Sequence, residues 1–182
     1  MTRIFFLSWL VLASLPAPVT AEPQLLKSSH DFDFSFGTWK EHSKRLLQPL
    51  TGSHKWVEWD GKTIVHKIWD GRANMAEFIG RTPVGPLKLI ALRIYNPATN
   101  QWSINFATEK IGKLGLYPGI GEFRNGRIDF FDQEPINGKI VLVRFSAYPI
   151  SPDHMRSEQA FSSDGGKSWE VNWVNDYSRI RG

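Results

Sequence analysis

Short runs of alternating apolar and polar residues fill the chain from Phe34 onward, and residues typical of tight turns separate them. Aromatic and β-branched residues dominate these runs, whereas apolar stripes with a helical period are hard to find. The pattern predicts a single all-β domain of about ten or eleven antiparallel strands. Because short connections make consecutive strands neighbours, we expect an up-and-down meander that closes into a barrel. A sandwich of two sheets stays open as the alternative, since turn spacing does not separate the two.

Pairs of Asp or Asn with Gly give the expected positions of the turns. These residues tolerate the positive φ angles that tight hairpin turns require. The glycine-rich segment 112–121 is interpreted as a mobile loop at the barrel mouth. The expected turns are Asp60-Gly61, Asp70-Gly71, Asn96 to Asn100, Asn125-Gly126, Asn137-Gly138 and Asp164 to Gly166.

The N-terminal segment carries the pattern of a secretory signal peptide. Arg3 precedes an apolar run from Ile4 to Leu15, prolines end the run, and Val19-Thr20-Ala21 supplies residues that suit a cleavage site. Cleavage after Ala21 would leave residues 22–182 as one soluble domain, periplasmic or secreted. A retained membrane anchor is the alternative, but the run falls short of the roughly 20 residues that a spanning helix needs.

Composition excludes several classes of protein. The chain has no cysteine, so disulfide-stapled scaffolds, thiolate metal sites and lipid-modified cysteines are ruled out. Its net charge of +4 comes from interspersed basic and acidic residues, which argues against a nucleic-acid surface. The five histidines form no metal-binding pair, so neither a metal nor a cofactor is expected. We find no nucleophile elbow, phosphate loop or dinucleotide fingerprint, and therefore name no catalytic residue.

Two features resemble a known group of barrels. Residues 33–39 include Gly37-Thr38-Trp39, which is similar to the G-x-W opening of lipocalin-like (calycin) barrels, where the Trp closes the barrel floor. The longer stretches 69–74 and 163–170 look like those of an uncharacterised bacterial calycin-like family of unknown function. The resemblance covers most of residues 22–182. It implies a cup-shaped cavity and no particular activity.

The segment Ser162 to Trp169 also fits the pattern S-x-D-x-G-x-[ST]-W, which resembles the Asp-box hairpin of sialidases. A sialidase propeller needs several such boxes and a far longer chain. We interpret the segment as a structural hairpin in which Asp and Ser side chains hold backbone amides and the Trp packs beneath.

Aromatic and charged residues inside the predicted strands supply the candidate binding residues. Tryptophan rings either line a cavity for an apolar or amphipathic ligand or fill the core. His66 lies inside an apolar strand, where it is a ligand, a base or a structural residue. The candidate ligand-binding residues are Trp39, Trp59, His66, Trp102, Arg144, Glu158 and Trp173.

Alternation gives an expectation for the arginines within strands. Arg93 shares a face with Leu89, Ala91 and Tyr95, opposite three isoleucine and leucine side chains, so we expect it to point outward. For Arg144 the two faces are nearly balanced. An inward Arg–Glu pair could orient a carboxylate or a polar head group, whereas a cross-strand ion pair on the barrel exterior is the alternative.

Three functions remain open from the sequence. The first is an exported protein that binds a small ligand of unknown identity. The second is an enzyme acting on a small molecule in a polar barrel interior, with His66, Arg144 and Glu158 as acid, anchor and base. The third is a filled structural or interaction barrel, which predicts no cavity larger than a few waters.

Overall fold

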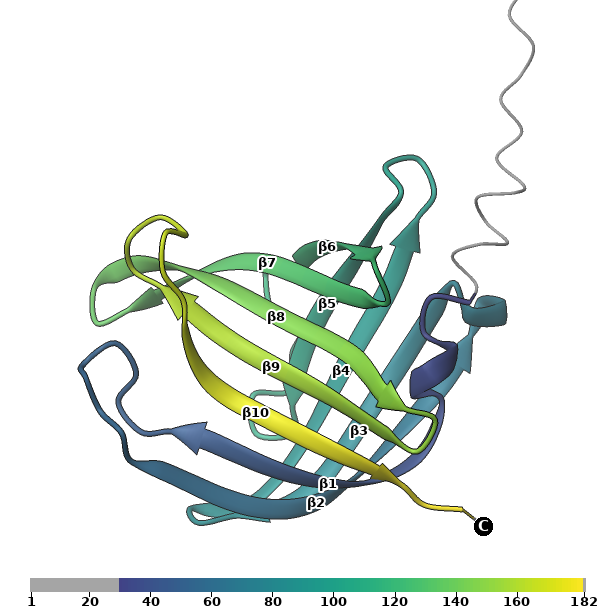
Figure 1. Cartoon of the computed structure of the whole chain (residues 1–182), viewed down its shortest axis with the longest axis horizontal. Helices are drawn as coiled ribbons and strands as arrows, with labels where there is room; N and C mark the ends of the chain where they lie inside the picture. Colours follow the sequence, from purple (N-terminus) through teal and green to yellow (C-terminus); the bar gives the residue numbers. More distant parts are fainter. Residues whose placement is uncertain (1–29, 182) are drawn as a thin grey trace, which may run out of the picture.

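The computed structural model describes residues 30–181 and shows one closed antiparallel barrel (Figure 1). Each strand pairs with the next along the chain, and the first pairs with the last. The all-β class, the meander and the closure are therefore confirmed, and the two-sheet sandwich is not. The predicted signal peptide lies outside the described residues. The strands are β1 (Gly37–Leu46), β2 (Trp56–Ile68), β3 (Ala73–Thr82), β4 (Gly85–Asn96), β5 (Gln101–Thr108), β6 (Gly119–Arg124), β7 (Arg127–Ile136), β8 (Lys139–Ser151), β9 (His154–Ser162) and β10 (Glu170–Arg179).

Most of the expected turns are where the sequence predicts them. Asn125 and Gly126 join β6 to β7 with φ angles of 52° and 76°, and Asn137 and Gly138 join β7 to β8 with 50° and 77°. Asp70 lies in a short 3-10 turn, η2 (Trp69–Gly71), between β2 and β3. Asp, Asn and Gly tolerate the positive φ angles found at these positions, and for this reason their pairs predict the turns correctly.

The turn expected at Asp60-Gly61 is wrong, because β2 runs through both residues without a break. Gly61 pairs with Glu41 on one side and with Gly80 on the other. A Cβ atom built on Gly61 would lie 2.2 Å from Cε2 of Phe78. Gly61 is therefore small because an aromatic ring packs against the backbone, and not because the chain turns there.

The hairpin between β9 and β10 has the structural role predicted for it. Asp164 Oδ1 accepts a hydrogen bond from the Ser168 amide at 2.9 Å, and Ser162 Oγ accepts one from the Gly166 amide at 2.8 Å. The Trp169 ring packs edge-to-face on Phe131 at 6.1 Å. The side chains thus hold the turn and the tryptophan anchors it.

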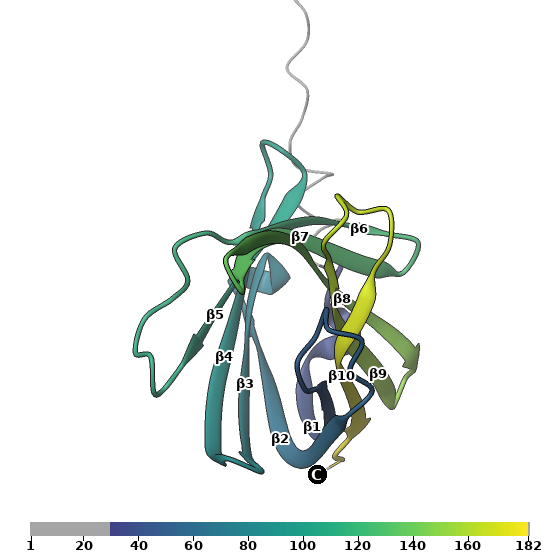
Figure 2. The ribbon, with the colours of Figure 1, turned by 90° about the vertical axis from the view of Figure 1, so that its left-hand side faces the viewer.

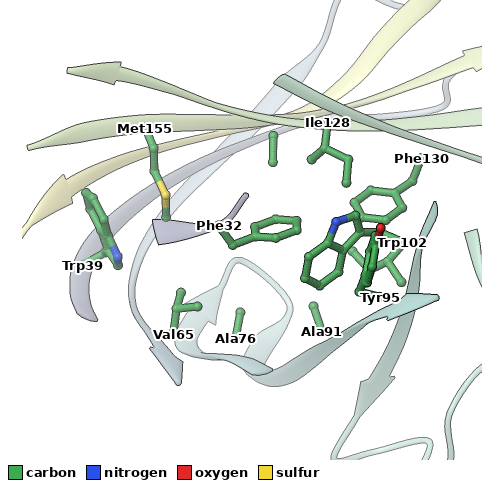
Figure 3. Close-up of a cluster of buried hydrophobic side chains, with 12 residues drawn as sticks. Phe32, Trp39, Val65, Ala76, Ala91, Tyr95, Trp102, Ile128, Phe130 and Met155 are labelled. Atoms are coloured by element: carbon green, nitrogen blue, oxygen red, sulfur yellow. The ribbon is translucent and has the colours of Figure 1, made fainter. Parts of the chain in front are cut away.

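The segment before β1, residues 30–36, closes one end of the barrel, and we call it the plug. A short 3-10 helix, η1 (Asp33–Ser35), follows Phe32, which is buried. The Phe32 ring points into the middle of the main core cluster, between Trp39 and Trp102 (Figure 3). Its ring centre lies 4.7 Å from that of Trp102 in an edge-to-face arrangement. The apolar core is therefore concentrated at this end, which we call the closed end.

The other end of the barrel carries the longer loops. The connections β1–β2, β5–β6 and β9–β10 all lie there, and the β5–β6 loop stands out from the wall of the barrel (Figure 2). A hollow of about 660 Å³ lies between this loop and the outer side of β3, β4 and β5, lined by Lys113 and Leu114 from the loop and by Glu77 and Ile90 from the wall. We call this end the mouth. No helix within residues 30–181 is long and apolar enough to cross a membrane.

Trp39 forms the floor of the closed end, as the G-x-W resemblance implies. It is fully buried, and its Nε1 donates to the Ser35 carbonyl at 2.8 Å. The Arg179 guanidinium lies 4.0 Å from the Trp39 ring centre and donates to the carbonyls of Phe34 at 2.9 Å and Phe36 at 2.7 Å. Arg179 therefore ties the plug segment to the last strand.

Replacing Arg179 with Met should destabilise the barrel by about 2–4 kcal/mol, because two carbonyls lose charge-assisted donors and Trp39 loses its cation–π contact. Urea unfolding followed by tryptophan fluorescence measures this loss. The matched control is Arg181→Met, at an arginine that is 75% exposed, which should change stability by less than about 0.5 kcal/mol. Equal effects of the two substitutions would show that Arg179 does not secure the plug.

Candidate ligand-binding site

The barrel encloses a cavity of about 270 Å³ that extends from the mouth toward the closed end. Inward-facing residues of nearly every strand line it, because period-two alternation places every second side chain inside. The lining residues are Glu41, Arg45, Thr63, Ala76, Phe78, Leu87, Leu89, Ala91, Arg93, Phe106, Glu134, Phe145, Gln159, Phe161, Trp173, Asn175 and Tyr177.

Strand β4 shows how the chemistry of the cavity changes with depth. From the mouth inward it contributes Leu87, Leu89, Ala91 and Arg93. The first three form an apolar wall, and Arg93 stands at the deep end, above the aromatic core. A largely apolar pocket with a few placed polar groups is the usual form of a small-molecule site.

Arg93 points inward, so the expectation that it faces solvent is wrong. Its side chain is 8% exposed and lines the cavity, while Ile90, Leu92 and Ile94 lie on the outer face. The expectation assumed that the more apolar face fills the core. Here the interior has to accommodate a cavity, and small or polar side chains line it instead.

Contacts on two sides hold the Arg93 guanidinium. Nη1 donates to Asn74 Oδ1 at 2.8 Å, and the Cζ atom lies 5.3 Å from the Phe32 ring centre. Burial lowers the pKa of Arg93 to about 10, which still leaves it cationic at neutral pH. Among residues 30–181, no carboxylate forms an ion pair with Arg93.

Glu41 is the buried acid of the cavity, and it belongs to a hydrogen-bond network between β1, β2, β9 and β10. Its Oε2 accepts from Thr63 Oγ1, and its Oε1 lies 3.0 Å from Ser43 Oγ. Ser43 Oγ also lies 2.8 Å from Asn175 Oδ1. Asn175 Nδ2 then donates to Ser157 Oγ at 2.9 Å. The network thus links polar side chains from opposite ends of the sequence.

A neutral Glu41 is compatible with the hydrogen bonds of this network. Ser43 has one hydroxyl proton but faces two acceptor oxygens, those of Glu41 and Asn175. If Glu41 carries a proton on Oε1, it donates to Ser43, and Ser43 donates to Asn175. Burial raises the pKa of Glu41 from 4.5 to about 7, against the lowering effect of the hydrogen bonds from Thr63 and Ser43.

Tyr177 stands beside this network at the deep end. It faces Glu41 in the β1–β10 register, and its hydroxyl lies 3.0 Å from Ser157 Oγ. Burial raises the pKa of Tyr177 well above 10, so the phenol stays protonated at neutral pH.

The interior holds a surplus of hydrogen-bond donors. Four buried nitrogens inside the barrel have no hydrogen-bond partner among residues 30–181: Trp59 Nε1, Asn74 Nδ2, Arg93 Nε and Trp173 Nε1. All four can only donate. Because buried polar groups are normally paired, a group of unpaired donors around a cavity marks a place where acceptors from another molecule would be favourable.

A side opening joins the cavity near the mouth. Only the first part of β5 pairs with the short β6, through Trp102 to Ile104. Within residues 30–181, the rest of β5 has no neighbouring strand on that side, and the amide of Gly115 in the β5–β6 loop donates to the Phe106 carbonyl at 3.2 Å instead. A second hollow of about 240 Å³ lies there and shares Phe106, Glu134, Phe145 and Gln159 with the main cavity. Burial and the nearby Asp132 raise the pKa of Glu134, against the opposing effect of Arg45.

The four predicted tryptophans lie inside the barrel, but at different depths. Trp173 lines the cavity near the mouth, with Arg45 4.7 Å from its ring centre. Trp59 packs edge-to-face on Trp173 at 6.0 Å. Trp39 and Trp102 belong to the core of the closed end. Trp173, and Trp59 behind it, therefore remain the predicted ligand contacts among the four.

The structure places the other three predicted residues on the outer face. His66 is exposed on β2, next to the buried Val65. Arg144 lies 4.7 Å from the Trp169 ring centre. Glu158 accepts a hydrogen bond from the Tyr148 hydroxyl at 3.1 Å. None of the three lines the cavity, and the exterior position weighed for Arg144 and Glu158 is the one observed.

Glu41, Asn175 and Tyr177 are the site residues that sequence reasoning missed. A signal for Glu41 was present, because it lies two residues after Trp39 on the same strand. If the G-x-W tryptophan closes the floor from inside, alternation also turns Glu41 and Ser43 inward. The partners on β10 had no comparable signal, since they lie more than a hundred residues away.

Comparison with known proteins supports the fold. The S-type phycobiliprotein lyase from Guillardia theta matches with a TM-score of 0.56 and 9% identity, over 91% of this chain and 99% of that chain. A redesigned β-barrel bound to DFHBI matches with a TM-score of 0.44 and 10% identity, over 82% of this chain and 99% of that chain. No family model and no curated protein matches the chain. At 9% identity the likeness to the lyase shows the fold alone, an antiparallel β-barrel, and the lipocalin-like family stays a prediction.

Replacing Glu41 with Gln should remove a pH dependence of stability. The native state keeps Glu41 protonated up to about pH 7, whereas the unfolded chain releases that proton near pH 4.5. The contribution of the protonated Glu41 to the free energy of unfolding is therefore complete below pH 4.5 and is lost as the pH rises to 7. The loss is about 3 kcal/mol at most. Glu41→Gln, which reproduces the neutral form, should be flatter over this range and more stable than the wild type at pH 8.

Urea unfolding at pH 4.5, 6, 7 and 8 measures this effect. Glu58→Gln is the control, because Glu58 is half-exposed on the outer face beside His42 and Lys44. A wild-type slope that persists in Glu41→Gln would show that Glu41 ionises as an ordinary surface acid.

Proposed function

We propose that this protein is exported and binds one small, largely apolar or amphipathic molecule inside its barrel. The observation that carries the proposal is the cavity of about 270 Å³, with an apolar wall along β4 and polar groups at its deep end. A filled structural barrel predicts no such space. Export is supported by the apolar N-terminal segment that precedes Ala21.

The enzyme hypothesis loses the residues that the sequence offered for it. His66, Arg144 and Glu158 lie on the outer face of three different strands and cannot act together on a molecule in the cavity. Among residues 30–181, no group of three or more His, Cys, Asp or Glu side chains is arranged to hold a metal ion. The likeness to a lyase concerns the fold and does not choose between the two functions.

The sides of β4 offer a matched test of binding inside the barrel. Leu89→Trp should fill the cavity and weaken binding of 1-decanol by about tenfold or more, because the added ring occupies the apolar wall. Ile90→Trp adds the same ring to the outer face and should leave binding unchanged. Isothermal titration calorimetry measures the affinity of the wild type and of both variants for 1-decanol.

Binding that Leu89→Trp does not weaken would place the ligand outside the barrel. A wild type that binds neither 1-decanol nor any molecule retained in native mass spectrometry would overturn the proposed function.

A further inference from the structure

The buried guanidinium of Arg93 raises the question of what neutralises it. An unpaired charge inside a protein costs several kcal/mol, and removing the partner of a buried pair is strongly destabilising. Arg93 is nevertheless 8% exposed, has no ion-pair partner among residues 30–181, and its Nε has no acceptor. The side chain is held in place by Asn74 and Phe32, so it is ordered rather than free to reach solvent.

Glu41, the buried acid of the cavity, does not neutralise the charge of Arg93. Glu41 lines the same cavity, yet its carboxyl oxygens are occupied by Thr63 and Ser43, and among residues 30–181 it forms no ion pair with Arg93. Burial favours its neutral form. Glu134 lies at the opposite end, near Arg45. Among residues 30–181, no carboxylate therefore pairs with the positive charge at the deep end.

We propose that Arg93 binds the carboxylate of an amphipathic acid whose apolar body lies along the wall of the cavity toward the mouth. This inference rests on the proposed function and names its class of ligand. A carboxylate accepts charge-assisted hydrogen bonds from a guanidinium, which are about twice as strong as neutral ones.

The rest of the cavity suits such a molecule. Leu87, Leu89 and Ala91 run from the mouth to Arg93 on one side, and Phe78, Phe145 and Phe161 contribute aromatic surface elsewhere. The cavity of about 270 Å³ lies near the lower end of the roughly 300–1,000 Å³ that small-molecule pockets span. That size matches a medium-chain monocarboxylic acid such as decanoate.

The test compares decanoate with 1-decanol, which has the same chain and a neutral head group. The wild-type protein should bind decanoate about tenfold more tightly or better, because only the acid pairs with the guanidinium. Arg93→Met should lose this preference while still binding 1-decanol, and Arg93→Lys should keep part of it. Calorimetric titration at pH 8 keeps decanoate ionised.

Arg144→Met is the matched control. Arg144 also lies in a strand and also has a buried Nε without a partner, but it faces outward beside Trp169. This variant should keep the wild-type preference. Thermal unfolding of Arg93→Met should show a melting temperature at or above that of the wild type, since an uncompensated buried charge is removed.

The outcomes separate this inference from the proposed function. Equal affinity of the wild type for decanoate and 1-decanol, or an unchanged preference in Arg93→Met, would overturn the role of Arg93 and leave binding in the cavity standing. Absence of binding for both molecules would overturn this inference, and it would overturn the proposed function as well if native mass spectrometry also shows no retained molecule. Should Arg93→Met fail to fold, the wild-type comparison and Arg93→Lys still decide the matter.

Discussion

The pairing of β1 with β10 is the constraint on which both the core and the cavity depend. It joins strands from opposite ends of the described chain and sets Trp39 against Arg179, Glu41 against Tyr177 and Ser43 against Asn175. Closure removes two sheet edges whose backbone groups would otherwise be unpaired. It also gives the inward polar side chains of β1 their partners, so that the polar end of the cavity exists only in the closed barrel.

The two halves of the barrel divide stability and binding between them. At the closed end, Phe32 and Trp102 fill the interior, and Arg179 secures the plug over Trp39. This dense packing supplies the burial that stabilises a domain of this size. The half toward the mouth can therefore keep a cavity and a buried cation, both of which lower stability. Such a division is expected where a rigid scaffold positions a binding site.

The fold was largely predictable from the local sequence. The faces of the strands that point into the barrel were not. Asn125-Gly126 and Asn137-Gly138 form turns because their backbone angles are positive. Asp60-Gly61 carries the same signal, but a glycine is needed at position 61 because the Phe78 ring of the neighbouring strand packs against the backbone there. No local pattern reveals this contact. Alternation says which residues share a face and not which face is inside. The hydrogen bond between Ser43 and Asn175 spans 132 residues, so its partners could not be paired from spacing.

The distribution of charge at the deep end of the cavity follows from how Glu41 is held. An ionised Glu41 would add a negative charge to the cavity, but Thr63 and Ser43 engage its oxygens, and burial favours the protonated form of the acid. The acid thus serves the β1–β10 junction and contributes no negative charge to the deep end below about pH 7. The unpaired nitrogens of Arg93 and Trp173 are donors as well. A cavity that offers donors and one positive charge is complementary to a molecule with acceptors and one negative charge.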